Sequence, residues 1–459
     1  MQNIILTLHN TLKPLLESHE RIELILAYSG GIDSQVLLHA LTHLYQQKLI
    51  SNQITVCHVN HGLSENAATW QTFAQQQCAN LPVKFVVKSV HVKAKAQQSL
   101  EALARDARYL ALKSVNAHQS IVLTGHHSDD QSETLLLALK RGAGLKGLAA
   151  MSAQIKLGQH LLIRPFLSVS RTAIEAYAKF YQLSWVEDDS NLDERFDRNF
   201  IRHQLMPLLQ SRWPSIKTTI NRSADHCTAG QELLDELGSE DLLNCRISVT
   251  SLDTDTLKKL STARFNNVIR FFMATKNCLM PSLKQLNQVR MQLTAKQDKS
   301  PEINVGDHMF RRYKQALYLT RLYQDISDWQ TNIDLSKQFF DILLPDNIGV
   351  LNGQQVEVKG DAIGIRLPNK NQQVSLRFKH DNPMCLPDFR QKSRQLKKVL
   401  QELNIPTWQR KRIAFLYYDD ELVAAINHFI CQPFVAKANV DTNLEGNEQC
   451  LIFTLKSEA

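Results

Sequence analysis

The chain has 459 residues, of which 43% are hydrophobic and 21% are charged, with a formal net charge of +8. This length exceeds what one hydrophobic core usually supports, so we expect two or three domains. No run of about eighteen apolar residues is present, and the N-terminal segment lacks the layout of a signal peptide, which predicts a cytoplasmic protein with no membrane partner. The positive charge suits a polyanionic partner, although a pI near 9.0 also occurs in enzymes that bind no nucleic acid.

The cysteines are scattered along the chain, and no two of them form a CxxC pair. This pattern indicates neither a disulfide framework nor a zinc knuckle, so we expect reduced thiols. They are Cys57, Cys78, Cys227, Cys245, Cys278, Cys385, Cys431 and Cys450.

Short β-branched runs alternate with longer amphipathic segments over the first part of the chain. The runs 22–27, 54–59, 83–87 and 121–124 are predicted as strands, and the segments between them show the apolar spacing of helices. Alternating strands and helices predict the α/β class, with a parallel sheet that binds its ligand beyond the carboxyl ends of the strands.

The pattern changes twice further along the chain. From about residue 213 to 321 the strand signals fade, and 263–274 and 283–293 are predicted as helices. After about residue 343, short alternating runs such as 355–358 and 374–378 predict a small mixed α/β domain. The predicted domains are a nucleotide-binding catalytic domain over 1–213, a helical domain over 214–325 and a small α/β domain over 343–459.

A diglycine turn between the first predicted strand and the first predicted helix is the most informative motif. Its backbone N–H groups can surround a phosphate-sized anion at the positive end of the helix. The carboxylate of Asp33 beside such phosphates needs a cation. No lysine follows the glycines as in the common nucleotide loop, and the alternative is an ordinary strand-to-helix turn capped by serine. The residues of this predicted phosphate site are Ser29, Gly30, Gly31, Ile32, Asp33 and Ser34.

Asp130 and Glu133 lie three residues apart at the predicted start of a helix. Their carboxylates therefore share one face near the positive end of the helix dipole, where they can hold a magnesium ion or bind an ammonium group. The alternative is a capping arrangement, with Asp129 or Asp130 as the N-cap and Glu133 as its partner. Taken alone, the spacing favours this alternative.

Four histidines, His58, His61, His126 and His127, follow the second and fourth predicted strands. With Asp129 they could form a zinc site. However, neither His58 with His61 nor His126 with His127 has the i, i+4 spacing that directs two helical rings at one ion. We favour histidines that hydrogen-bond or stack beside a nucleotide.

The nearby segment 142–147 matches the dinucleotide fingerprint GxGxxG, but it follows a predicted helix and lacks the ribose-binding acid. We therefore interpret it as a flexible basic loop near the active site that contacts RNA phosphate.

Two groups of basic residues suit a polyanion. Arg195, Arg198 and Arg202 recur at helical spacing and can neutralise a phosphate or a transition state. About equally favoured is a surface helix salt-bridged to Asp188, Asp189 and Asp197. A second group near Trp408 suits a nucleic-acid backbone, with a solvated helix face as the alternative. The second group is Arg390, Lys392, Arg394, Lys397, Lys398, Arg410 and Lys411.

Together these motifs resemble one family, the tRNA(Ile)-lysidine synthetases of the PP-loop ATP pyrophosphatase superfamily. The diglycine loop alone gives only the superfamily. The segments that add specificity are 58–63, 100–109, 125–134, Arg164-Pro165 and 187–202, whereas the C-terminal part resembles the family loosely. Ser64 stands where many members carry arginine, so we assign no phosphate contact to it.

The resemblance implies a ligase that forms a carbon–nitrogen bond between free L-lysine and C2 of the wobble cytidine in a tRNA(Ile) with a CAU anticodon. ATP adenylates the cytidine and releases pyrophosphate, and lysine then displaces AMP, which changes decoding and identity from methionine to isoleucine. The phosphate site above would then bind ATP. The resemblance leaves the oligomeric state open, with a homodimer as one alternative.

The resemblance assigns residues of this sequence to each step of the reaction. Asp33 would bind Mg²⁺, whose charge offsets the charge that accumulates as pyrophosphate leaves. Asp130 and Glu133 would bind the ammonium of lysine, and either of them could accept its proton. Arg198 or Arg202 would stabilise the phosphate of the adenylated intermediate.

Three other functions were considered, and one feature of the sequence disfavours each of them. A tRNA thiolase would activate a base similarly and then deliver sulfur, which the lack of a CxxC pair disfavours. A non-catalytic RNA-binding protein would have no need of Asp33, Asp130 and Glu133 beside a glycine loop. A glutamine-dependent amidation would need a glutamine-hydrolysing domain, and the sequence indicates none.

Overall fold

The computed structural model describes residues 4–18, 22–62, 66–90, 100–187, 191, 193–294, 302–357, 363–437 and 449–456. The chain divides into two compact units, residues 1–237 and 238–459. The finer division into domains at residues 213 and 325 stays a prediction. Across the described ranges, no helix is both long enough and apolar enough to cross a membrane.

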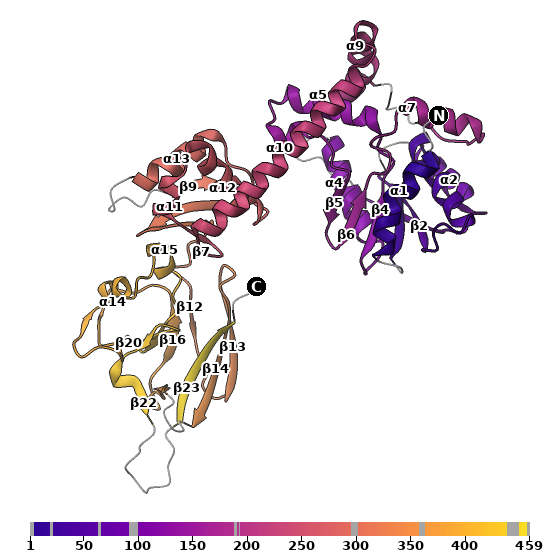
Figure 1. Ribbon diagram of the computed structural model, residues 1–459. Helices are drawn as coiled ribbons and strands as arrows, with labels where there is room; N and C mark the ends of the chain where they lie inside the picture. The colour runs from indigo at the N-terminus through magenta and orange to yellow at the C-terminus, as the bar shows by residue number, and fades with distance from the viewer. Residues whose placement is uncertain are drawn as a thin grey trace. The chain divides into compact units, whose positions relative to one another are not determined.

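The first unit is built on a six-stranded sheet in the order β3-β2-β1-β4-β6-β5, coloured indigo to violet in Figure 1. All neighbouring strands are parallel except β5 and β6. The helices and strands are α1 (Ile4–Glu17), β1 (Glu23–Tyr28), α2 (Ile32–Gln46), β2 (Ile54–Asn60), α3 (Ala67–Cys78), β3 (Lys84–Ser89), α4 (Leu100–Lys113), β4 (Ser120–Leu123), α5 (Ser128–Lys140), α6 (Leu145–Leu148), β5 (Gln154–Leu157), β6 (His160–Ile163), α7 (Arg171–Phe180), α8 (Asp197–Phe200), the π-helical turn η2 (Ile201–Leu205), α9 (Met206–Arg212) and α10 (Ile216–Cys245).

Helices cover both faces of this sheet, and the alternation of β1 shows which residues face which layer. Leu24 and Leu26 pack in the larger core with α1, α2, α3 and α7. The intervening Ile25 faces the opposite side and packs in a second core with Leu112 of α4. A strand buried on both faces has no polar alternation, which explains why β1 reads as a continuous apolar run.

The carboxyl ends of β1, β2 and β4 lie at the same edge of the sheet. Tyr28 pairs with His58, and Leu26 pairs with Leu123. The predicted strands therefore agree with β1 to β4 within two residues at each end. The loops predicted to carry the site follow these strands directly, as the rule for parallel sheets requires.

The hairpin of β5 and β6, which forms one edge of the sheet, was not predicted from the sequence. These strands have four residues each and are joined by Gly158 and Gln159, with a φ of 65° at the glycine. Two-residue hairpin connections favour glycine because it adopts positive φ, so Gly158 was a hairpin signal present in the sequence. Because β5 runs antiparallel to β6, the sheet is mixed at this end.

The second unit begins with a five-stranded antiparallel sheet in the order β7-β8-β11-β10-β9. Its core combines strand residues such as Leu252 and Phe310 with Phe265 and Leu286 of the helices. The elements are β7 (Arg246–Ser248), β8 (Ser251–Asp253), α11 (Thr254–Lys259), α12 (Thr262–Ala274), α13 (Leu283–Thr294), β9 (Glu302–Val305), β10 (His308–Tyr313) and β11 (Ala316–Arg321).

The two predicted helices of this segment correspond to α12 and α13, but the expectation that strands fade here is wrong. Three of the strands have only three or four residues, and β10 contains the buried pair Arg311 and Arg312. Arg312 donates to the carbonyls of Gln292 and Leu293 near the C-terminal end of α13, at 2.8 and 3.2 Å. A buried arginine that donates to the free carbonyl groups at a helix end is still a polar residue in the sequence. The hydrophobic pattern therefore did not indicate a strand here.

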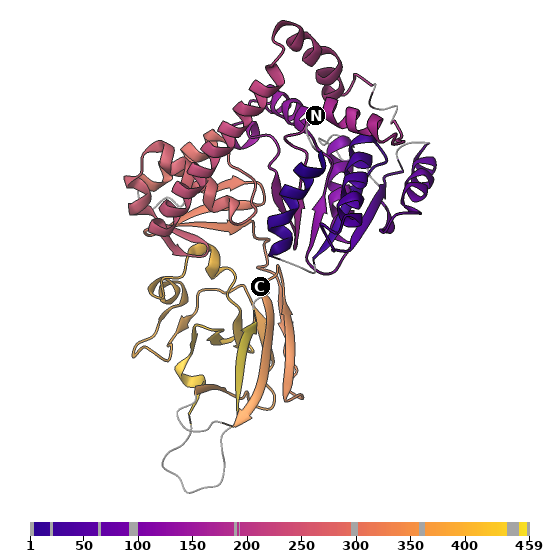
Figure 2. The ribbon, with the colours of Figure 1, turned by 45° about the vertical axis from the view of Figure 1, so that its right-hand side comes forward.

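The remainder of the second unit contains two further five-stranded antiparallel sheets, β12-β16-β19-β20-β21 and β13-β14-β23-β15-β22. Figures 1 and 2 show β13, β14 and β23 side by side, in agreement with their registers. The predicted runs 355–358 and 374–378 correspond to the end of β14 and to β16. The elements are β12 (Gln330–Asn332), β13 (Phe339–Leu344), β14 (Gly349–Glu357), β15 (Ile363–Arg366), β16 (Val374–Arg377), β17 (Met384–Cys385), β18 (Arg394–Gln395), α14 (Leu396–Glu402), α15 (Thr407–Arg410), β19 (Phe415–Tyr418), β20 (Glu421–Ala425), β21 (Phe429–Ile430), the 3-10 turn η3 (Gln432–Phe434), β22 (Val435–Lys437) and β23 (Gln449–Lys456).

Candidate active site

The diglycine turn joins β1 to α2 and is held by its own hydroxyl groups. The Oγ of Ser34 accepts from the N–H groups of Ser29 at 3.3 Å and Gly30 at 3.2 Å, and it donates to the carbonyl of Gly31 at 2.9 Å. Ile32 is buried in the main core and therefore anchors the turn. The predicted phosphate-site residues thus form one tight turn at the N-terminus of a long helix, where N–H groups and the helix dipole favour an anion.

Two glycines allow the loops after β1 and β4 to lie against their neighbours. Gly30 has a φ of +88°, and a Cβ there would lie 2.9 Å from Cγ2 of Val186. A Cβ on Gly125 would lie 3.0 Å from the backbone carbonyl of Asp33. A larger residue at position 30 would be strained by the positive φ and would press on Val186, and one at position 125 would push the loop after β4 away from Asp33.

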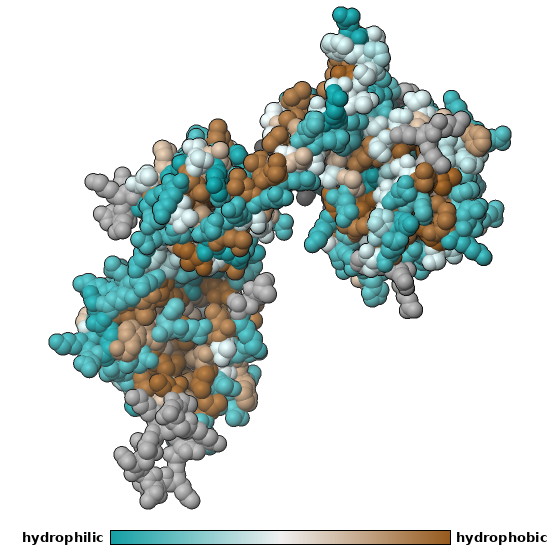
Figure 3. Space-filling model, viewed as in Figure 1, coloured by the Kyte–Doolittle hydropathy of each residue, from teal (hydrophilic) through white to brown (hydrophobic). Residues whose placement is uncertain are grey.

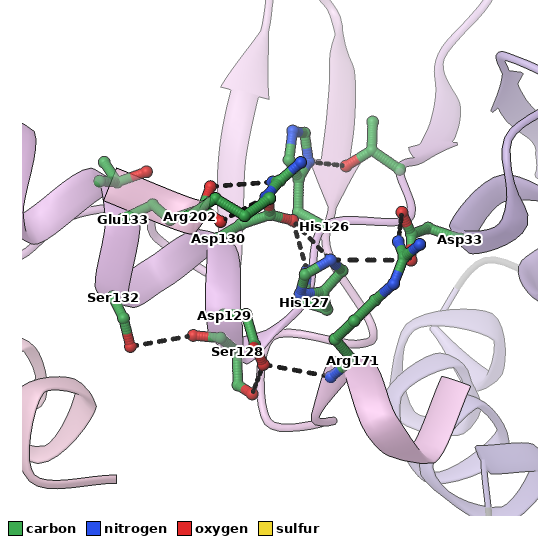
Figure 4. Close-up of polar contacts among 12 residues, drawn as sticks. Asp33, His126, His127, Ser128, Asp129, Asp130, Ser132, Glu133, Arg171 and Arg202 are labelled. Atoms are coloured by element: carbon green, nitrogen blue, oxygen red, sulfur yellow. Dashed lines mark hydrogen bonds and ion pairs between the residues drawn. The ribbon is translucent and has the colours of Figure 1, made fainter. Parts of the chain in front are cut away.

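Asp33 does not stand free beside the turn. Its carboxylate is bound through both oxygens by Nη1 of Arg171, at 2.8 and 2.7 Å, and Nε2 of His127 lies 3.6 Å from Oδ1. Figure 4 shows these three side chains converging from α2, the start of α5 and the start of α7. Burial raises the pKa of Asp33 above its usual value, although His127 and Arg171 act against this shift.

The first turn of α5 begins at His127, which is the N-cap, and the backbone N–H of His127 donates to Oδ2 of Asp130 at 3.0 Å. A capping box is therefore present, but its residues differ from the alternative considered: His127 is the cap in place of Asp129 or Asp130, and Asp130 is the reciprocal residue in place of Glu133. Burial alone would raise the pKa of Asp130, but the surrounding His127 and Arg198 hold it below its usual value.

Glu133 lies one turn further along α5 and is almost completely buried, with 3% of its side chain exposed. Arg198 donates to it from Nε at 2.9 Å, and Arg202 donates from Nε and Nη2 at 2.7 and 2.9 Å. Arg202 also reaches Asp130 at 3.3 Å. The sequence-predicted acids and two of the predicted arginines thus form one cluster, in which each buried carboxylate is neutralised by a guanidinium.

The third predicted arginine lies outside this cluster. Arg195 precedes α8, is 89% exposed and pairs with Asp193 at 2.7 Å. Asp197, the described member of the three acids suggested as partners for the arginines, pairs instead with Lys140 at 2.6 Å. The prediction of one continuous cationic helix side is wrong because Arg195 is not on the helix and Arg202 is on the π-helical turn η2.

The four histidines do not form the zinc site that was considered. His58 bonds the carbonyl of Tyr28 at 3.1 Å, His61 lies 3.4 Å from Nε of Arg108, and His126 bonds Oγ1 of Thr124 at 2.9 Å. Nowhere in the described part of the chain do three or more His, Cys, Asp or Glu side chains form a group that could hold a metal ion.

Several motif residues lie outside the described residues or lack described side chains. Leu63, Ser64, Asp188, Asp189 and Ser190 belong to the first kind, and Leu100, Glu101 and Ala102 belong to the second. The glycine-rich segment 142–147 is described. It follows α5, as predicted, and residues 145–148 form the short helix α6 instead of continuing as a loop.

Three family models match the chain. Residues 5–209 match the PP-loop domain, residues 252–318 the TilS substrate binding domain, and residues 374–445 the TilS substrate C-terminal domain. The chain is 44% identical over 411 residues to the tRNA(Ile)-lysidine synthase of Serratia proteamaculans, covering 89% of this chain and 92% of that protein.

The chain belongs to the tRNA(Ile)-lysidine synthase family. The corresponding proteins of Pectobacterium atrosepticum and Coxiella burnetii are 40% and 38% identical, and each match covers at least 89% of both chains. The predicted family and the nucleotide-binding fold of the first domain are thereby confirmed. As a lysidine synthase family member, the chain is an enzyme with an ATP-binding PP-loop domain.

The basic residues predicted to contact RNA lie within or beside the segment that matches the lysidine synthase C-terminal domain. Figure 3 shows a hydrophilic surface over α14, where Lys397 and Lys398 are exposed. Arg390 and Arg394 both pair with Glu402, and Nε of Arg410 donates to the carbonyl of Ile405 at 2.8 Å.

Trp408, the aromatic residue noted near this basic group in the sequence, is buried. Its side chain is buried between the rings of Tyr313 and Tyr318, with the guanidinium of Arg311 at 5.5 Å. The remaining lysines, Lys392, Lys397, Lys398 and Lys411, are exposed.

Sequence reasoning missed Arg171 as a site residue of this lysidine synthase family member. It lies on α7, far along the chain from Asp33, and no motif marked it. The segment before it contains Ser170, which caps α7 by accepting from the N–H of Ala173. That N-cap signal locates the helix start, but only the tertiary structure shows which loop the first helical residue meets.

The buried His126 gives a pH-dependent stability that can be measured. Burial of its imidazole lowers its pKa to about 4, and Arg164 and Arg198 act in the same direction against Asp130. Because an unfolded histidine has a pKa of about 6.5, unfolding takes up a proton at intermediate pH, and stability contributed by the neutral ring is lost as the pH falls from 6.5 towards 4.

We therefore expect a His126→Asn variant to lose less stability than the wild type between pH 7 and pH 5, by about 1–2 kcal/mol in urea unfolding. His9→Asn, on α1 and outside the site, serves as the matched control. Equal losses in the wild type and in the His126 variant would contradict a neutral, buried ring.

Proposed function

We propose that this protein joins free L-lysine to C2 of the wobble cytidine in a tRNA(Ile) with a CAU anticodon, and consumes ATP to give AMP and pyrophosphate. The observation that carries the proposal is the cluster of Asp130, Glu133, Arg198 and Arg202 next to the diglycine turn. The relatives named tRNA(Ile)-lysidine synthase support the same reaction. The product changes decoding and identity from methionine to isoleucine.

The activation step uses the diglycine turn. The N–H groups and hydroxyls of Ser29, Gly30 and Ser34 now bond one another, and the same donors can turn to the leaving pyrophosphate. Donors already ordered in this way need little rearrangement when charge develops, which is the principal source of electrostatic catalysis. The oxygen at C2 of the cytidine attacks the α-phosphate of ATP, and the bond between the α- and β-phosphates breaks.

Mg²⁺ fits the donor set at Asp33. Magnesium in phosphate-transfer sites is commonly held by one or two carboxylates, with substrate phosphates and water as the other ligands. Asp33 and Asp130 both face His127, at 3.6 and 3.5 Å, so two carboxylates converge there. When bound, the metal would neutralise charge on the departing pyrophosphate, and Arg171 would release Asp33 and keep its second partner, Glu175.

The lysine step uses the buried acids. The ε-amine of lysine is protonated at neutral pH, so it must be bound as an ammonium and then lose a proton before it attacks C2. Asp130 and Glu133 supply the opposite charge and a proton acceptor. Attack forms the carbon–nitrogen bond and expels AMP, and the proton passes to the carboxylate.

The arginines link the two steps through charge balance. In the structure, two guanidinium groups neutralise the two acids. The phosphate of the adenylated cytidine is a new anion beside them, and it attracts Arg198 and Arg202 away from the carboxylates. The acids are then free to bind an ammonium, so lysine is admitted after activation.

The reaction is tested by incubating the protein with ATP, labelled lysine and a tRNA(Ile) transcript, followed by mass analysis of the anticodon nucleosides. We expect lysidine at the wobble position in the wild type. Glu133→Gln should lower lysine transfer about 100-fold and retain tRNA-dependent exchange of pyrophosphate into ATP, because general acid–base groups contribute about 10² to 10⁴.

Glu236→Gln on the exposed face of α10 is the matched control, since it removes a carboxylate outside the site. It should retain full transfer. The absence of lysidine with the wild-type protein would contradict the proposed reaction, and full transfer by the Glu133 variant would contradict the role of that carboxylate.

The exposed lysines of α14 are proposed to contact the tRNA backbone. Each phosphate contact releases counterions, so the logarithm of the association constant falls with the logarithm of the salt concentration in proportion to the number of contacts. The charge reversal Lys397→Glu with Lys398→Glu should weaken tRNA binding and lower this slope by about 2. An unchanged slope would place the RNA contacts elsewhere, and Lys337→Glu, outside this surface, is the control.

A further inference from the structure

The first turn of α5, which carries Asp130 and Glu133, is attached to two other helices through Asp129. The Oδ1 atom of Asp129 accepts from the backbone N–H of Arg171, at the start of α7, at 3.1 Å. Its Oδ2 atom is paired with the ammonium of Lys217 on α10. Figure 4 shows that the Asp129 side chain turns to Arg171, whereas Asp130 turns to the opposite side and faces His127.

A second set of contacts holds the same turn of α5 against α10. The Nδ2 of Asn221 donates to the carbonyl of Ser128 at 2.9 Å, and the hydroxyl of Ser132 donates to Oδ1 of Asn221 at 2.9 Å. Ser132 is completely buried, and the N–H of Ser128 donates to the carbonyl of Val169 at 2.9 Å. The turn is therefore fixed on one side by α10 and on the other by the start of α7.

We propose that Asp129 is a positioning residue, which with Lys217 and Asn221 holds the carboxylates of Asp130 and Glu133 in register with the phosphate-binding turn. This inference rests on the proposed lysine-binding role of these two acids. Asp129 itself touches neither the lysine-binding cluster nor the diglycine turn, and it acts through the backbone of α5 and α7.

The path to the phosphate-binding helix is short. Asp129 fixes the backbone of Arg171, and the guanidinium of Arg171 binds both oxygens of Asp33 on α2. Burial opposes the ionised form of Asp129, but the ammonium of Lys217 and the N–H of Arg171 hold the pKa of this carboxyl below its usual value. The carboxylate is therefore ionised at neutral pH, and removal of Lys217 leaves it without its charge partner.

Asp129→Asn and Lys217→Met test this role. Asparagine keeps the acceptor for the N–H of Arg171 and removes the oxygen that binds Lys217. The activation step at the diglycine turn should therefore be nearly unchanged. We expect each variant to raise the KM for lysine about tenfold, in line with the loss found for residues that orient a functional group, and to change tRNA-dependent pyrophosphate exchange less than about twofold.

Three comparisons separate positioning from general destabilisation. The double variant should lose no more than the worse single variant, because both changes remove one interaction. Lys217→Arg should restore the wild-type KM. Asp197→Asn, which breaks the exposed pair with Lys140 at the other end of α5, should change neither step.

Amide hydrogen exchange supplies a measurement independent of activity. Lys217→Met should speed exchange in the first turn of α5 about tenfold or more, with little change in β1 or β4. If the wild type makes no lysidine, the proposed function fails, and the exchange rates still decide whether Asp129 and Lys217 hold this turn. Unchanged exchange together with an unchanged KM, or a parallel fall of both steps with thermal stability, would overturn the positioning role.

Discussion

The neutralisation of buried carboxylates is the constraint on which the rest of the first unit depends. Glu133 keeps only 3% of its side chain exposed, and a charge removed from water to this extent is tolerated only when it is paired and hydrogen-bonded. Arg198 and Arg202 provide this pairing, so the segment of α8 and η2 must lie against α5. A π-helical turn at Arg202 is one of the local irregularities that often accompany functional sites.

The same principle organises the neighbouring parts of the site. Asp33 is paired with Arg171 and Asp129 with Lys217, so these carboxylates, like Glu133, are each matched to a cation from another helical segment. Such pairs contribute little net stability when both ions are buried, but breaking one of them is costly. They therefore suit a site in which substrates with charges of both signs replace the internal partners in turn.

Much of this site could be predicted from sequence because its signals are local. The diglycine turn after β1 and the two acids at the start of α5 depend on residues within a few positions of one another. The arginines were expected to neutralise a phosphate or a transition state. In the structure Arg198 and Arg202 pair with Glu133, and their contact with a phosphate stays a prediction. His127 as the N-cap was not found, since an acidic residue beside it offered a better capping signal.

The missed residues act across long separations in sequence. Arg171 and Lys217 reach the site from α7 and α10, and neither belongs to a motif, so only the packing of these helices shows their partners. The strands β7 to β11 were missed for a different reason. Three of them have only three or four residues, and the arginines of β10 are buried by contacts with a helix end and with Glu302, which a hydrophobic pattern does not register.

We propose that the carboxylates of Asp130 and Glu133 exchange internal guanidinium groups for the ammonium of lysine. Calorimetric titration of lysine and of norleucine, which lacks the ε-amine, into the protein with tRNA and a non-hydrolysable ATP analogue tests this most directly. We expect that lysine binds, that norleucine binds at least about tenfold more weakly, and that Glu133→Gln removes this preference. Equal binding of the two amino acids by the wild type would contradict it.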